Sequence, residues 1–133
     1  MTKIKIKMSI NIPDNAPRRI LDLDESIRFV AFTDRFGTKM ISEQRKGLEP
    51  LLTEDELKQQ ATVSAQMMNT IKGLRPKLGS PICSSTLYEK VKWATILLDN
   101  TKEYDLLMLS FDIGLDHESV ILNKILPMVK KGW

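Results

Sequence analysis

The sequence is poor in the residues that build cross-links, metal sites and catalytic bases. Its 133 residues contain one cysteine, Cys83, and one histidine, His117. A single cysteine excludes an internal disulfide and fits a protein of a reducing compartment, so we expect a cytoplasmic location. No glycine-rich phosphate-binding loop of the P-loop or dinucleotide type is present, and no cofactor is expected.

Long apolar runs and a strong excess of one charge are also missing. No segment approaches the length of a membrane-spanning helix, and the N-terminus has no apolar signal-peptide core, so we expect neither an anchor nor a leader. Lysine and arginine number 20 against 17 aspartates and glutamates, a net charge of +3, and the two signs are mixed along the chain. This pattern is typical of a solvated surface and not of a nucleic-acid-binding one.

The two residues with catalytic or ligating potential have simpler explanations. His117 is flanked by Asp116 and Glu118, and this acidic cluster could hold a divalent metal. A helix that begins at Asp116 uses the same acids at its own N-terminus, however, and would leave His117 exposed on the first turn. Cys83 falls within a predicted strand, where a buried thiol is usually inert. The sequence therefore predicts no catalytic or metal site and a protein that is not an enzyme.

The densest group of strand-forming residues lies in the segment Ser80–Asp112. Trp93–Leu98 and Tyr104–Phe111 flank a polar, turn-like link, which predicts a β-hairpin. Leu106–Leu109 is apolar without alternation, as in a central strand with both faces covered, so helices are expected on both sides of the sheet. Ile82–Tyr88 is predicted to be a further strand. Because Glu89–Lys92 lacks glycine, proline and asparagine, one long bent strand over residues 80–98 stays open as an alternative.

The N-terminal residues Lys3–Ile12 alternate between apolar side chains and mostly lysines. This period of two predicts an edge strand, which could pair with the protein's own sheet or with a neighbour's, and the alternative is a basic arm. Pro13 ends the strand. A short helix is expected to follow, capped by Asp14 or Asn15.

A second hairpin is predicted from Ser26–Thr33 and Thr38–Arg45, which flank the turn residues Asp34 and Gly37. Strict alternation would place the side chains of the first strand on two faces. These are Ile27, Phe29 and Ala31 on one face, and Arg28, Val30 and Phe32 on the other.

Three leucines crowd the loop that follows this hairpin. Leu48, Leu51 and Leu52 stand in a stretch interrupted by Gly47 and Pro50. They are expected to fold under as a lid on the core, or alternatively to line a pocket or a protein contact.

The strongest helix signal begins at Thr53 and ends near Leu74. Thr53 and Glu56 form a capping box, and small or flexible apolar residues follow at steps of three and four. One face of this helix must pack on the sheet, but small residues and methionines also suit a contact with a partner. The residues predicted for a partner or dimer interface are Ala61, Ser64, Ala65 and Met68.

A final helix is predicted from Asp116, with Lys130 and Lys131 at its C-terminal end. Pro127 lies inside the apolar pattern, so the helix is expected to kink there or to finish with a separate turn. Trp133 is expected to dock back on the molecule or to serve a partner.

The order of these elements resembles the roadblock fold. The early hairpin with Asp34 and Gly37, the capped helix from Thr53, the meander to Phe111 and the closing helix from Asp116 carry the resemblance over residues 14–131. It implies an α+β fold in which a five-stranded antiparallel sheet, with a possible extra N-terminal edge strand over residues 1–12, has the long helix on one face and the terminal helices on the other. The stretches LDLDESIRFVAFTDRFG and LDHESVILNKIL also resemble a group of short archaeal proteins with no assigned activity.

The resemblance implies a non-enzymatic protein-interaction module formed by one domain, residues 1–133. Such a module would be a homodimer, built through the helix Thr53–Leu74 and an adjoining sheet edge, and would act as a platform for a small GTPase or a signalling protein. The missing turn signal at Glu89–Lys92 leaves a PAS-like or profilin-like arrangement open. The alternative function is therefore a PAS-like sensor that holds a small molecule between the sheet and the Leu48–Leu52 loop.

Overall fold

The computed structural model of the chain describes residues 10–99, 101–114, 116–131 and 133. Its strands are β1 (Ile27–Thr33), β2 (Met40–Gln44), β3 (Cys83–Leu87), β4 (Lys92–Leu97) and β5 (Leu106–Phe111). Its helices are α1 (Ala16–Leu21), α2 (Glu54–Lys72), α3 (Arg75–Leu78), α4 (His117–Val120), the π-helical segment η1 (Ile121–Ile125) and α5 (Leu126–Lys131).

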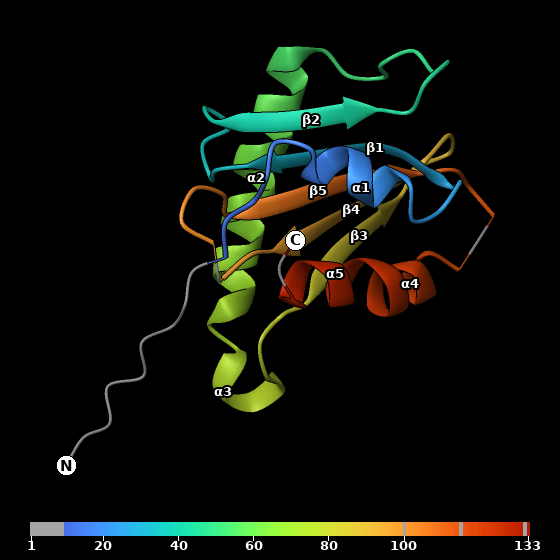
Figure 1. Ribbon diagram of the computed structural model, residues 1–133. Coiled ribbons are helices and arrows are strands. Elements are labelled where there is room, and N and C mark those ends of the chain that lie inside the picture. Colours follow the sequence, from blue (N-terminus) through green and yellow to red (C-terminus); the bar gives the residue numbers. More distant parts are fainter. Residues whose placement is uncertain (1–9, 100, 115, 132) are drawn as a thin grey trace.

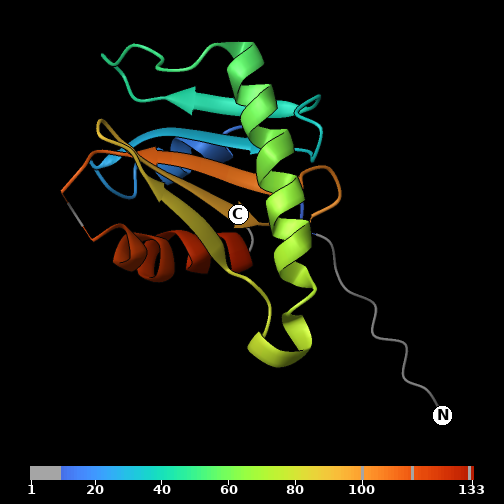
Figure 2. The ribbon, with the colours of Figure 1, turned by 180° about the vertical axis from the view of Figure 1, so that it is seen from behind.

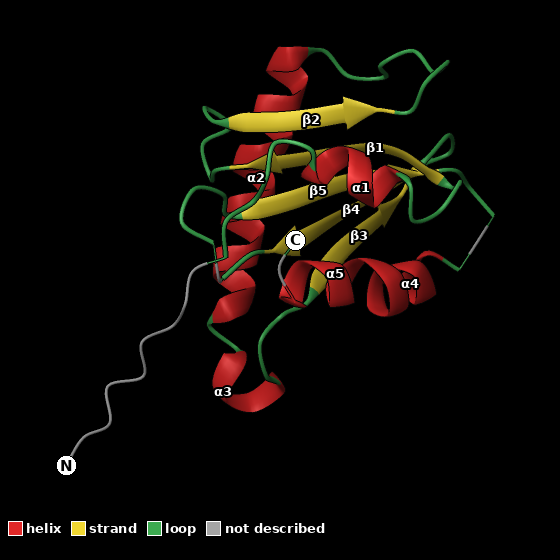
Figure 3. Cartoon of the chain, viewed as in Figure 1, coloured by secondary structure: helices red, strands yellow, loops and turns green. Residues whose placement is uncertain are grey.

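The strands form one antiparallel five-stranded sheet in the order β2-β1-β5-β4-β3. Helices α1, α4 and α5 cover one face of this sheet (Figure 1), and α2 runs across the strands on the opposite face (Figure 2). Figure 3 shows the same three layers by element type. The predicted α+β fold, with helices on both faces, is therefore confirmed.

Strand β5 is the centre of the sheet, as its uninterrupted apolar run predicted. All of its residues are buried, and it pairs with β1 on one side and β4 on the other. The strands β3 and β4 are separate, because the Tyr88 amide donates a hydrogen bond to the Val91 carbonyl at 2.9 Å and closes a tight turn. The prediction of three strands in this region is confirmed.

The two faces of the sheet carry cores of unequal size. The face toward α1, α4 and α5 holds most of the large buried side chains, including Ile20, Phe32, Phe111 and Ile121. On the α2 face, a smaller cluster joins Ala31, Ala61, Trp93 and Met108. Short side chains there let α2 lie close to the strands, where the Thr95 hydroxyl donates to the Ser64 hydroxyl at 3.3 Å.

The turn between β1 and β2 is built around Asp34 and Gly37, as predicted. The Asp34 carboxylate accepts hydrogen bonds from the amides of Phe36, Thr38 and Lys39. Gly37 has a φ of 70° and lies against α2, where a Cβ atom would stand 2.9 Å from the Cα of Lys58. Glycine is required at this position both for its conformation and for its small size.

The alternation predicted for the first strand is wrong at its start. Ile27 packs in the core under α1, whereas Phe29 packs on the α2 face, although strict alternation places both on one face. The pairing with β5 slips between these two residues, because Ile27 is opposite Phe111 and Phe29 is opposite the adjacent Ser110. Arg28 is thus the extra residue of a β-bulge, which shifts the phase of the strand.

The predicted N-terminal strand falls mostly outside the described residues, since residues 3–9 are not among them. Within the described part, Ile10 forms an isolated parallel bridge with Thr101, and Ile12 packs against the larger core.

The C-terminal helix changes its hydrogen-bond register before Pro127. In the segment η1, the Leu126 amide donates to the Ile121 carbonyl, five residues back, and α5 then continues through the proline. The register change, and not a separate turn, accommodates Pro127. Trp133 docks on the molecule, with its ring edge-to-face on Phe32 at a centroid distance of 5.9 Å.

The exposure predicted for His117 is wrong. The side chain is buried, its ring lies 4.8 Å from that of Phe111, and Nε2 donates to the Asp112 carbonyl at 2.5 Å. Asp116 caps the helix as predicted, through the Ser119 amide. His117, the first residue after the cap, therefore faces the sheet, where the ring of Phe111 covers it. Among the described residues, no helix combines the length and the apolar character needed to cross a bilayer.

Candidate functional site

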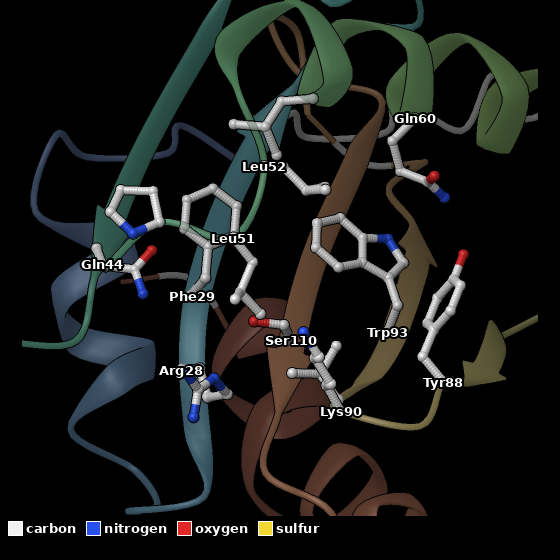
Figure 4. Close-up of a pocket in the computed structure, with 13 residues that line it drawn as sticks. Arg28, Phe29, Gln44, Leu51, Leu52, Gln60, Tyr88, Lys90, Trp93 and Ser110 are labelled. Carbon is white, nitrogen blue, oxygen red and sulfur yellow. The ribbon is translucent and has the colours of Figure 1, made fainter. Parts of the chain in front are cut away.

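A pocket of about 330 Å³ opens on the α2 face of the sheet (Figure 4). It lies between the N-terminal half of α2, the segment before that helix, the strands β1, β5 and β4, and the turn from β3 to β4. The residues that line it are Arg28, Phe29, Gln44, Pro50, Leu51, Leu52, Leu57, Gln60, Tyr88, Lys90, Val91, Trp93 and Ser110.

The strand register sets the floor of the pocket. Ser110 on β5 is opposite Phe29 on β1 and also opposite Trp93 on β4, so the three side chains form one row across the sheet. The two aromatic rings stack at a centroid distance of 6.2 Å, above the short serine between them. A flat apolar surface results, with one hydroxyl at its centre.

The position of α2 explains why this row is open. The helix approaches the neighbouring row, where Ala31 and Met108 lie opposite each other and contact Ala61. Helix and sheet come close there, and the row with Phe29 and Trp93 is left beside the helix instead of beneath it. Sites for small molecules are concave and mostly apolar, as this pocket is.

The leucines of the loop have different positions. Leu51 and Leu52 line the pocket, and Leu52 also packs against the smaller core, whereas Leu48 is half-buried and does not line the pocket. Whether the three leucines serve as a lid on the core or as a pocket or contact loop stays a prediction.

Two cationic side chains, Arg28 and Lys90, lie at the end of the pocket away from α2 (Figure 4). The bulge brings Arg28 to this end, beside Lys90 of the β3–β4 turn. Arg28 Nη1 is 2.6 Å from the Asp112 carboxylate, but its Nε–H is buried without a partner. On the side of the pocket toward Gln60 and Tyr88, the indole Nε1–H of Trp93 is also buried without a partner (Figure 4). No aspartate or glutamate is among the lining residues.

Most of the residues predicted for an interface are buried within the monomer. Ala61, Ser64 and Met68 are buried against the sheet, and Ala65 is half-buried. Other apolar residues on α2 and just after its C-terminal end are exposed to solvent. These are Val63, Met67 and Leu74, which are 58%, 39% and 51% exposed. The interface on this helix stays a prediction. In the sequence, the stripe of small residues and methionines stood out more strongly than Val63 and Leu74 did.

Strand β3 is an edge of the sheet. Among the described strands it pairs only with β4, and its residues CSSTL carry no charge. Natural edge strands are usually protected by lysine, proline or a bulge, and β3 has none of these. Met67 lies next to this strand, with its sulfur 3.8 Å from the Ser84 hydroxyl.

The reactive residues weighed from the sequence, Cys83 and His117, are not hydrogen-bonded to each other. Cys83 is half-buried on β3, and burial raises the pKa of its thiol, with a smaller contribution from Glu118, so its nucleophilic form is disfavoured. The buried His117 holds the Asp112 carbonyl. In the part of the chain that the structure describes, no group of three or more His, Cys, Asp or Glu side chains could hold a metal ion.

No protein-family model matches the sequence, and no curated protein matches it. Similar solved structures exist. Gliding protein MglB from Thermus thermophilus has a TM-score of 0.59 at 17% identity, over 90% of this chain and 88% of that one. A structure described as MglB with tetrameric arrangement gives the same four values, 0.59, 17%, 90% and 88%. Myxococcus xanthus MglB has a TM-score of 0.59 at 16% identity, over 85% of each chain.

The likeness to MglB concerns the fold, which is roadblock-like, as predicted. The resemblance to short archaeal proteins stays a prediction.

Proposed function

We propose that this chain is a non-enzymatic protein-interaction module that forms a homodimer and presents a platform to a partner, such as a small GTPase or a signalling protein, in the cytoplasm. The roadblock-like fold supports this function, since the resemblance implies dimerisation through the long helix and a sheet edge. The tetrameric arrangement described for one MglB structure is also consistent with self-association of the fold.

The observation that carries the proposal is the joined surface of α2 and β3. An uncharged edge strand has unpaired backbone groups, and it lies directly beside an exposed apolar flank of the helix. A second copy related by a two-fold axis could pair its own β3 in antiparallel orientation and cover the same flank. An unprotected edge strand is a template for pairing with another chain, and an exposed apolar flank gains from burial, so one contact would use both features.

The test is the mass of the protein in solution, measured by light scattering and by native mass spectrometry. We expect a dimer. Met67→Glu, which places a charge in the proposed contact, should shift the population to monomer by at least tenfold in dissociation constant. The matched control is Gln66→Glu, which adds the same charge to an exposed position on another side of the helix and should leave the mass unchanged.

Two results would overturn the dimer. One is a wild-type protein that remains monomeric at high concentration, and the other is equal dissociation of both variants. Partner binding is then tested separately, by measuring the affinity of the wild type and of Met67→Glu for GTP-loaded and GDP-loaded small GTPases.

The sensor function predicted as the alternative requires an apolar cavity with a few convergent polar groups. The pocket beside α2 has such a composition. Ligand binding is a property that a dimeric platform could have in addition, and the two are separable by experiment.

A further inference from the structure

We propose that the pocket between α2 and the sheet binds a small amphipathic monocarboxylate, a molecule with a flat or short aliphatic apolar body and one carboxylate. This site goes beyond the interaction platform, which does not require it. The apolar body would lie on the rings of Phe29 and Trp93, and the carboxylate would lie at the end with Arg28 and Lys90.

The shape and the lining set the size and character of the ligand. A volume of about 330 Å³ is at the small end of sites for small molecules. The stacked rings of Phe29 and Trp93 form the floor, and Leu52 and Leu57 contribute to the wall on the helix side. A body of one aromatic ring or a short alkyl chain suits this space, whereas a larger polymer or peptide segment does not.

The polar groups determine the charge of the ligand. Arg28, Lys90 and the Trp93 indole are all donors, and no lining residue is an acid. Two of these donors, Arg28 Nε–H and Trp93 Nε1–H, are buried without a partner, and an unpaired buried donor is unfavourable. A ligand carboxylate at the end with Arg28 would supply an acceptor for the arginine donor, whereas the Trp93 donor lies on the side of Gln60 and Tyr88.

The charge balance favours a single negative charge. Asp112 already neutralises part of the Arg28 guanidinium, at 2.6 Å from Nη1. Lys90 is exposed and has no ion-pair partner among the described residues. One net positive charge at this end is matched by a monoanion, and a planar carboxylate can accept from the guanidinium and the ammonium together.

The β-bulge is an independent sign that this end of the pocket is a site. In a regular strand, Arg28 and Phe29 would point to opposite faces of the sheet. The extra residue brings both of them to the same pocket. Bulges are frequent next to functional sites, where they redirect a side chain, and here the redirected side chain is the arginine.

The test uses 4-phenylbutyrate and octanoate as probes, with 4-phenylbutanamide and octanamide as matched neutral compounds. Binding is followed by the fluorescence of Trp93 in a Trp133→Phe background, so that the reporter lies in the pocket, and by calorimetry on the wild-type chain. We expect at least one acid to bind and its amide to bind at least about tenfold more weakly, the difference typical of a hydrogen-bonded charge.

Two variants locate the carboxylate, and one controls for general charge. Arg28→Met and Lys90→Gln should each weaken binding of the acid about five- to tenfold and leave binding of the amide unchanged. Because Lys90 is exposed, its variant keeps the test valid if Arg28→Met fails to fold. Lys131→Gln removes the same charge from an exposed position on the opposite face and should change neither.

Several outcomes would overturn the proposal. These are the absence of binding by either acid, equal binding of acid and amide, equal weakening by Lys131→Gln, and binding of an acidic peptide in the absence of binding by the free acids. The oligomeric mass of Lys90→Gln is measured in the same samples, so failure of this site is distinguished from failure of the dimer.

Discussion

Asp24 joins the loop before β1 to the C-terminal helical segment. Its carboxylate is 2.9 Å from the Lys124 ammonium and also accepts from the amide and hydroxyl of Ser26. The pKa of Asp24 is lowered from its ordinary value of 3.8 to about 2, chiefly by the hydrogen bond from Lys124 and then by those from Ser26. This residue therefore contributes a pH-dependent part of the stability.

We predict that Asp24→Asn lowers the free energy of unfolding by about 1–2 kcal/mol at pH 7, allowing for the solvent exposure of Lys124. The folded carboxylate releases its proton more readily than the unfolded one, so its contribution is present above about pH 4 and is lost as the pH falls toward 2. Urea unfolding of both proteins between pH 7 and pH 2.5 should give converging stabilities. A difference that stays constant with pH, or an equal loss in the exposed neighbour Asp22→Asn, would contradict this assignment.

The contact between the β1–β2 turn and α2 depends on a single glycine. We predict that Gly37→Ala destabilises the fold by at least about 2 kcal/mol, because the new Cβ meets the Lys58 backbone at 2.9 Å in addition to the cost of positive φ. Gly47→Ala is the matched control. Its φ is 86° but no atom lies within 4 Å of the new Cβ, so only about 1 kcal/mol should be lost. Thermal and urea unfolding of the two variants measure the difference, and equal losses would show that the close contact is unimportant.

At the scale of elements, the close packing of α2 on the sheet depends on small side chains. We predict that Ala61→Leu costs about 1–3 kcal/mol, because the larger side chain cannot fit between the helix and Met108 without moving one of them. Thr62→Leu, at the exposed next position, should change stability by less than about 0.5 kcal/mol. Chemical unfolding gives both values. If Ala61→Leu were tolerated as well as Thr62→Leu, the close approach of α2 would not be required.

The sequence predicted the elements better than it predicted their details. Hydrophobic alternation, turn residues and the Thr53 capping box correctly predicted the hairpins and α2, because each is a local signal. The bulge at Arg28 has no such signal, since an extra residue is recognisable only through the strand that it faces. The β3–β4 turn was also uncertain, because Glu89 and Lys90 close it without the residues that usually mark turns.

The pocket could be predicted only in part for the same reason. The leucines before α2 indicated a pocket wall only as one alternative, and the floor depends on a register that joins β1, β5 and β4 from distant parts of the chain. His117 was wrongly predicted to be exposed, because its burial depends on a contact with Phe111 and the sequence signals for the helix carry no information on that contact. Contacts between elements, and not the elements themselves, were the unpredictable part.

At the scale of the whole molecule, the two tryptophans report on opposite faces of the sheet. Trp93 belongs to the smaller core on the α2 face, and Trp133 packs beside Phe32 in the larger one. We predict that the chain unfolds as one domain, because both cores share the same strands. The unfolding curves of Trp93→Phe and Trp133→Phe, each followed by the remaining tryptophan and by circular dichroism, should coincide within each variant. Separate transitions in the two probes would mean that the faces unfold independently.

The pairing of β1 with β5 also has a consequence for synthesis. Ile27 and Phe111 are partners, although most of the chain lies between them. As the protein leaves the ribosome, the first hairpin emerges long before the strand that completes it, and until then only α1 covers part of its apolar face. We expect the nascent chain to depend on chaperones until Phe111 has emerged, and the sheet to close only near the end of translation.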